Sequence, residues 1–168
     1  MHERIRSTTH APHVRTLNHI HDGLVQLFAQ IHVEKPGTRL GYVAGIITSD
    51  GPEKIWENID HLEQHTHRLR AEHSWPIFSA TDVFSRELFD RLDVGVAHPQ
   101  EYQHFWRNVL GSGYVTDIFM TPRWEISKGA IDEFETATRL GLTTHFVDTA
   151  AHEPALHHVH SRSDTPQV

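Results

Sequence analysis

The feature that most constrains the fold is an apolar run from Leu40 to Ile47 that shows no helical period. Such a run is typical of a strand that is buried on both faces of a parallel sheet. Further strands are predicted at 75–79, 115–120 and 143–147, and helices at 55–71, 102–110 and 130–140. Because strands alternate with helices, we expect an α/β domain with a mostly parallel sheet covered on both faces. Ligands of such domains bind outside the carboxyl ends of the strands.

Two further segments flank this predicted domain, which spans residues 39–147. Apolar residues at three- and four-residue intervals predict an amphipathic helix between Val14 and Ile31, so residues 1–38 are expected to be an N-terminal extension with an additional helix. The apolar face of that helix could contact a second copy of the chain. Residues 148–168 contain two prolines and little apolar material, and we expect a flexible tail there. A short helix is predicted inside the long connection 81–98, and long connections often act as lids.

Composition restricts the chemistry and the partners. The chain of 168 residues has no cysteine, which excludes disulfides and thiolate catalysis. A net charge of −7 without a basic run disfavours a nucleic-acid polymer and favours a small molecule. No stretch approaches the roughly 20 apolar residues of a membrane span, and no secretory signal is recognisable, so we expect a cytoplasmic protein without a membrane partner. The 17 histidines are scattered, and His61 and His65 lack a third ligand, so neither a metal nor a cofactor is expected.

The segment 121–141 carries the most informative polar residues. Ser127 stands where the N-cap of the 130–140 helix is expected, and its hydroxyl can accept a hydrogen bond from a backbone N–H group. Gly129 has no side chain to cover the first helical turn. Because the N-terminus of a helix presents free N–H groups and a positive dipole end, this position favours a phosphate or carboxylate.

Glu133 lies one turn further along the same helix. At about 100° per residue, the predicted buried stripe consists of Ala130, Ile131, Phe134, Ala137, Leu140 and Gly141, and the predicted outer face of Asp132, Glu135, Thr136 and Arg139. Glu133 falls on the flank of that stripe, where a carboxylate is partly desolvated and could serve as a nucleophile. It could equally be a boundary residue or a partner that reaches back to the helix start.

A resemblance supports the catalytic interpretation of Glu133. The order of residues is similar to the signature of the nucleoside 2-deoxyribosyltransferase superfamily over about 39–147, and most closely to that of a short phage and bacterial subgroup. In the last third of the chain the matching residues are Asp117-Ile118-Phe119-Met120, Pro122, Trp124, Glu125, Ser127, Gly129, Ala130, Glu133, Ala137 and Gly141. Upstream, Tyr42-Val43-Ala44-Gly45 resembles the first strand and glycine turn of the family. The resemblance implies a flavodoxin-like three-layer fold, and a homo-oligomer whose sites are completed across a subunit contact.

The resemblance also implies roles for single residues. The glutamate that matches Glu133 attacks the anomeric carbon, displaces the base and holds the sugar as an ester, as in a retaining glycosidase. The residue that matches Ser127 meets the 5′ end of the sugar, where a serine favours a nucleotide over a nucleoside. Nucleotide hydrolases of the family carry an arginine after the first glycine turn, which this chain lacks, and Arg123 or Lys128 could replace it.

The remaining candidate residues are assigned to the same pocket. Tyr42, Gly45 and Ile46 are expected to line the space for sugar and base, together with Gly129 at the 5′ end. Trp124 could stack on a base, or it could fill a gap in the packing of its turn. Asp117 belongs to the motif and is counted with the substrate-binding residues, although it could instead cap the entrance of its strand.

The function expected from the sequence is therefore an N-glycosidase that acts on a nucleoside 5′-monophosphate. Two alternatives stay open. The chain could transfer a base between deoxyribosides, or it could be a non-catalytic module that senses a nucleotide.

Overall fold

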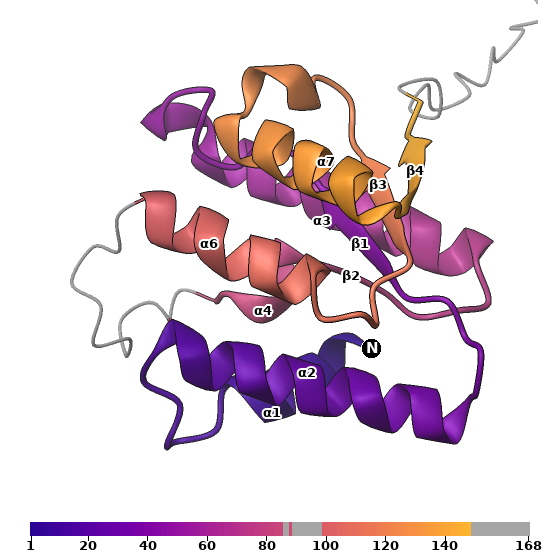
Figure 1. Cartoon of the computed structure of the whole chain (residues 1–168). Helices are drawn as coiled ribbons and strands as arrows, with labels where there is room; N and C mark the ends of the chain where they lie inside the picture. The colour runs from indigo at the N-terminus through magenta and orange to yellow at the C-terminus, as the bar shows by residue number, and fades with distance from the viewer. Residues whose placement is uncertain (86–87, 89–98, 149–168) are drawn as a thin grey trace, which may run out of the picture.

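The computed structural model describes residues 1–85, 88 and 99–148, and they form the expected α/β fold (Figure 1). The sheet contains β1 (Gly41–Ala44), β2 (Ile77–Ser79), β3 (Asp117–Met120) and β4 (Thr143–Phe146). All four strands are parallel and lie in the order β2-β1-β3-β4. The prediction of a parallel sheet is thus confirmed. Strand β1 is shorter than the apolar run 40–47 from which it was predicted.

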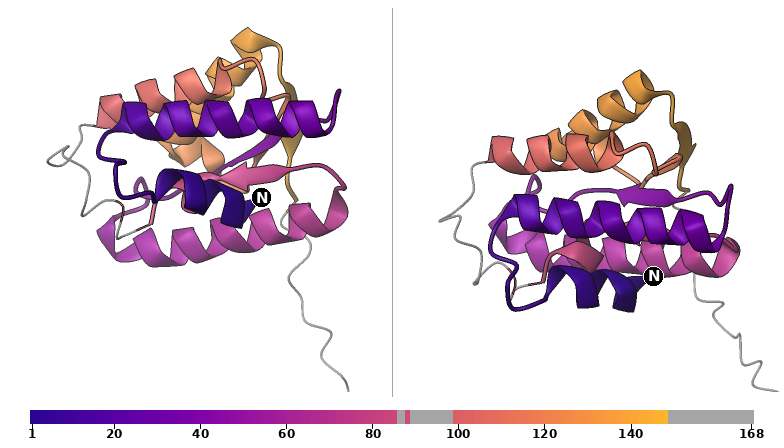
Figure 2. Two further views of the ribbon diagram at one scale, coloured as in Figure 1. Left: turned by 90° about the horizontal axis from the view of Figure 1, so that it is seen from below. Right: turned by 60° about the horizontal axis from the view of Figure 1, so that its bottom comes forward.

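Helices cover both faces of the sheet and make three layers (Figures 1 and 2). One face carries α2 (Leu17–Glu34), α6 (Pro99–Leu110) and α7 (Lys128–Leu140), and the other carries α3 (Ile55–Glu72). Successive strand residues point to opposite faces, so Tyr42 and Ile118 join the larger hydrophobic cluster while Val43 and Phe119 pack on the α3 side. The central strands are therefore buried on both faces, as their apolar sequence predicts.

The N-terminal segment contains the predicted additional helix, and its apolar residues are part of the hydrophobic core. It forms α1 (His2–Thr9), which the sequence did not predict, and α2. Ile5 and Phe28 are fully buried, and α1 packs against α2 and the short helix α4 (Ala80–Val83) (Figure 2). The expectation that the apolar face of α2 is free to contact a second copy is wrong, because this face packs against the protein's own sheet and α6.

Two short 3₁₀ helices complete the described structure, namely η1 (Pro52–Lys54) and η2 (Trp124–Ile126). Within the described residues, no helix combines the length and apolar character that a membrane crossing requires. Most of the predicted lid at 81–98 and nearly all of the predicted tail at 148–168 lie outside the described residues.

Candidate functional site

A cavity of about 700 Å³ lies at the carboxyl ends of the strands, within the size range of small-molecule sites. It is bounded by the loop after β1, the first turns of α4 and α7, and one side each of α3 and α6. The described residues that line it are Tyr42, Gly45, Ile47, Thr48, Ser49, Ile59, Leu62, Ala80, Thr81, Phe84, Pro99, Tyr102, Gln103, Trp106, Ile126, Ser127, Lys128, Gly129, Ala130 and Glu133. Only two of these carry a full charge when ionised, Lys128 and Glu133.

Glu133 lies against the first strand of the sheet. The phenol of Tyr42 on β1 donates a hydrogen bond of 2.8 Å to Oε1 of Glu133, across 91 residues of sequence. Both side chains are almost inaccessible to solvent, with exposed fractions of 1% for Tyr42 and 7% for Glu133. The hydroxyl therefore fixes one carboxyl oxygen and leaves the other to interact with a ligand.

Burial controls the ionisation of this pair. Desolvation raises the pKa of Glu133 to about 8, and the negative charge of Asp132 adds to the rise, whereas the hydrogen bond from Tyr42 opposes it. Desolvation likewise raises the pKa of Tyr42 well above its usual range. Tyr42 thus keeps its proton near neutral pH and stays a hydrogen-bond donor. The pKa of Glu133 lies close enough to neutral pH for its carboxyl to gain or lose a proton there, as acid–base catalysis requires.

The buried side of α7 differs from the predicted stripe. Ala130, Glu133, Thr136 and Ala137 are buried, while Leu140 is 46% exposed. The prediction was wrong for Thr136, which is buried, and for Leu140 and Gly141, which are exposed, because α7 packs against α6 as well as the sheet. Phe134 instead packs on Trp124, with ring centroids 4.7 Å apart.

The start of α7 brings several polar groups to the cavity. Ser127 is the N-cap, and its Oγ accepts a hydrogen bond from the N–H of Ala130 at 3.3 Å. Ser49, in the loop after β1, donates a second hydrogen bond to this Oγ at 3.4 Å. Lys128 and Gly129 line the cavity beside them. Two hydroxyls therefore lie at the N-terminal turn of this helix, and Lys128 borders the cavity in the same turn.

Gly45 permits the close contact between the loops after β1 and β3. A Cβ atom at this position would lie 2.3 Å from Oγ1 of Thr121, closer than any real contact allows. Thr121 in turn donates through Oγ1 to the carbonyl of Ala44 at 3.0 Å. A side chain at position 45 would thus push apart two of the loops that form the cavity.

Four predicted site residues do not line the cavity. Asp117 lies at the amino end of β3, the opposite end of the sheet, where it accepts hydrogen bonds from Arg39 and pairs with His145. It caps the strand entrance, and its assignment to the substrate was wrong because a motif position does not reveal which end of a strand it occupies. Arg123 forms an ion pair with Asp50.

The other two are Ile46 and Trp124. Ile46 is buried outside the lining, although it follows Gly45 directly. Trp124 packs on Phe134 and Phe146, so its geometry corresponds to the packing alternative and not to base stacking.

Sequence reasoning missed the wall that α6 contributes. Tyr102, Gln103 and Trp106 face the cavity, and Phe84 makes an edge contact with Tyr102 at 5.5 Å. The aromatic residues at 102–106 are conspicuous in the sequence, but helical periodicity interprets them only as core. Nothing in that pattern reveals which of them borders a cavity.

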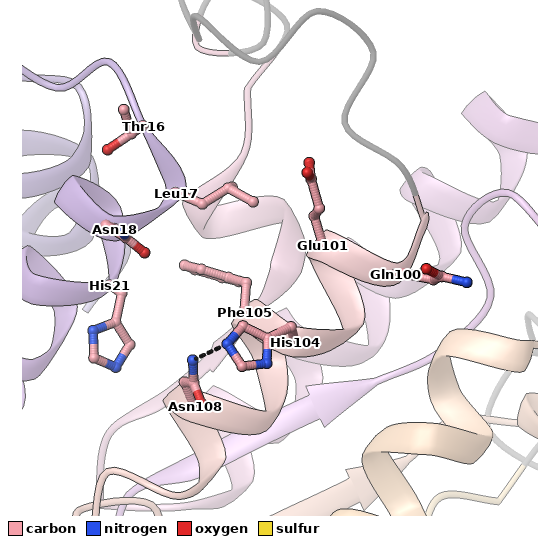
Figure 3. Close-up of a pocket in the computed structure, with 9 residues that line it drawn as sticks. All are labelled: Thr16, Leu17, Asn18, His21, Gln100, Glu101, His104, Phe105 and Asn108. Carbon is pink, nitrogen blue, oxygen red and sulfur yellow. Dashed lines mark hydrogen bonds between the residues drawn. The ribbon is translucent and has the colours of Figure 1, made fainter.

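A second, shallower groove of about 560 Å³ lies on the other side of α6 (Figure 3). It separates the first turns of α2 from α6 and is lined by Thr16, Leu17, Asn18, His21, Gln100, Glu101, His104, Phe105 and Asn108. His104 and Asn108 are hydrogen-bonded to each other at 3.1 Å, as the dashed line in the figure marks.

No family model, curated protein or solved structure matches this chain. The resemblance to the deoxyribosyltransferase superfamily therefore depends on the motif residues alone. Of these, Ser127, Gly129 and Glu133 converge in the cavity, whereas Asp117 and Trp124 do not.

The described side chains favour acid–base and covalent chemistry by a carboxyl group. Within residues 1–85, 88 and 99–148, no group of three or more His, Asp or Glu side chains is placed to hold a metal ion. The cavity combines one buried carboxyl, a fixed phenol donor and the N-terminal turn of a helix.

Proposed function

We propose that this protein is an N-glycosidase that cleaves the base–sugar bond of a nucleoside 5′-monophosphate. The observation that carries the proposal is the position of Glu133, which is the only acidic side chain among the described lining residues and is held by Tyr42 beside the start of α7. A small ligand with a phosphate at one end and an electrophilic carbon near its middle fits this arrangement.

The reaction would proceed through a glycosyl ester. The carboxylate of Glu133 attacks C1′ of the sugar, and the electrons of the C1′–N bond leave with the base, which takes up a proton. Water then attacks C1′ of this ester and loses a proton, while the C1′–O bond to Glu133 breaks, which restores the carboxylate and releases the sugar phosphate. Tyr42 holds Oε1 during both steps, while Ser127 and Lys128 bind the phosphate.

The test is to incubate the protein with adenosine, guanosine, cytidine and uridine 5′-monophosphates and their 2′-deoxy forms, and to measure free base by chromatography. We expect release of at least one base together with a sugar phosphate. The same incubation with an added free base identifies the transferase alternative, because a new nucleoside or nucleotide would form instead.

One observation favours the non-catalytic alternative. The pKa of Glu133, about 8, leaves the carboxyl largely protonated at neutral pH in the empty site, and a protonated carboxyl is no nucleophile. A nucleotide-sensing module would bind its ligand and return it intact. Calorimetric binding without base release, measured between pH 7 and pH 9, would establish that alternative and reject the glycosidase.

A further inference from the structure

Helix α6 separates the two hollows of the molecule. Its residues Tyr102, Gln103 and Trp106 line the cavity with Glu133, whereas Gln100 and His104 line the groove between α2 and α6. The two glutamines of this helix therefore border different hollows, Gln100 the groove and Gln103 the cavity. One of them, Gln103, contributes the only side-chain amide among the described lining residues of the cavity.

The proposed function leaves one part of the cavity for the base. If Glu133 lies at C1′ and the phosphate at Ser127, the base must extend toward the remaining wall. That wall contains a chain of contacting aromatic rings, here called the ring ladder, formed by Tyr42, Trp106, Phe84 and Tyr102. Tyr42 and Trp106 have centroids 4.7 Å apart, Trp106 and Phe84 lie 6.0 Å apart, and Phe84 and Tyr102 lie 5.5 Å apart.

The rings of the ladder differ in how far they are exposed. Tyr42 and Trp106 are buried, whereas Phe84 and Tyr102 are only partly covered and offer ring surface to the cavity. Ile59 and Leu62 of α3 line the same cavity and are apolar. A flat heteroaromatic ring suits such a lining, because stacking on an aromatic side chain is favourable for every base.

We infer that α6 recognises the base, with Tyr102 stacking on it and Gln103 pairing with the polar edge of adenine. This inference rests on the proposed function, since it assumes that the ligand is a nucleotide. A glutamine amide combines one donor and one acceptor, which matches the N6 amino group and N7 of adenine in a bidentate pair.

The absence of charge on the described part of this wall argues against guanine and cytosine. Guanine presents two acceptors, O6 and N7, and is matched best by arginine or lysine, while the amino group of cytosine is matched by a carboxylate. Among the described lining residues, Lys128 stands at the start of α7 and Glu133 on its inner side, so neither belongs to the ring ladder. The wall that α6 offers is uncharged and carries a single amide.

The test compares three substitutions by calorimetric binding of AMP, dAMP, GMP, CMP and UMP, each made in a Glu133→Gln background to suppress turnover. Gln103→Ala should weaken AMP and dAMP roughly 10- to 100-fold and change the other nucleotides little, as expected for one bidentate pair. Tyr102→Leu should weaken all nucleotides by a similar factor, because stacking does not distinguish bases. Gln100→Ala is the matched control and should change nothing, since this side chain faces the other groove.

Two results would overturn the inference while leaving the proposed function intact. One is base release by the parent enzyme with a preference for a base other than adenine, and the other is an equal effect of Gln103→Ala on every nucleotide. Conversely, adenine-selective binding that depends on Gln103, without base release by the parent protein, would reject the glycosidase and retain the assignment of α6. If no nucleotide binds at millimolar concentration, both are wrong.

Discussion

Burial gives Glu133 a pKa that an exposed glutamate does not have, and this predicts the pH dependence of the reaction. Because only the carboxylate attacks C1′, kcat/KM for base release should rise with pH and level off above about 8, the pKa of Glu133 in the empty site. Tyr42→Phe removes a donor that lowers this pKa, so the rise should move to higher pH. Steady-state rates between pH 6 and pH 10 provide the measurement, and a rate that is flat over this range would contradict the assignment.

Replacing Glu133 by glutamine should have opposite effects on activity and stability. Removal of the nucleophile should reduce base release on the order of a thousandfold or more, whereas activity within about threefold of the parent would reject the assignment. Folding raises the pKa of this carboxyl, so the stability that its protonation supplies is complete below the unfolded-state value of 4.5 and is lost progressively up to about 8. Glu133→Gln should therefore melt above the parent at pH 8, and the difference should shrink toward pH 5.

At the scale of the element, the start of α7 predicts a preference for phosphate. Ser127→Asp should preserve the helix, because aspartate is as good an N-cap as serine. It should nevertheless reduce nucleotide turnover about 10- to 100-fold, since repulsion replaces a charge-assisted hydrogen bond worth roughly 1.5 to 3 kcal/mol. Turnover of the matching nucleoside should stay similar or improve. If the parent already prefers the nucleoside, the phosphate assignment is wrong and the transferase becomes the better proposal.

At the scale of the whole molecule, the N-terminal helix should be needed for stability. Deletion of residues 1–10 removes Ile5 from the core and breaks the ion pair Arg4–Glu34 and the hydrogen bond between His2 and Asp82. Full burial of one isoleucine contributes about 1.5 to 3 kcal/mol, so the Tm should fall by roughly 5 °C or more. For deletion of residues 151–168, composition predicts almost no change, and that variant is the comparison. An unchanged Tm after the N-terminal deletion would show that α1 is dispensable.

The sequence by itself determined the features that depend on neighbours along the chain. The alternation of strand-like and helix-like apolar patterns predicted the parallel α/β sheet. The hydrogen-bonding preference of serine located the N-cap at Ser127. The backbone freedom of glycine located the end of α7 at Gly141, where φ is 71°. Helical period also brought Glu133 near the buried side of its helix, although it misplaced Thr136 and Leu140.

Only the tertiary structure decided which side chains share the site. Tyr42 meets Glu133 across 91 residues, Asp117 proves to lie at the far end of its strand, and α6 divides its residues between a cavity and a groove. Periodicity specifies a face only relative to the axis of its own element. Which neighbour covers that face, and how far a helix rotates against it, depends on packing between segments that are distant in the chain.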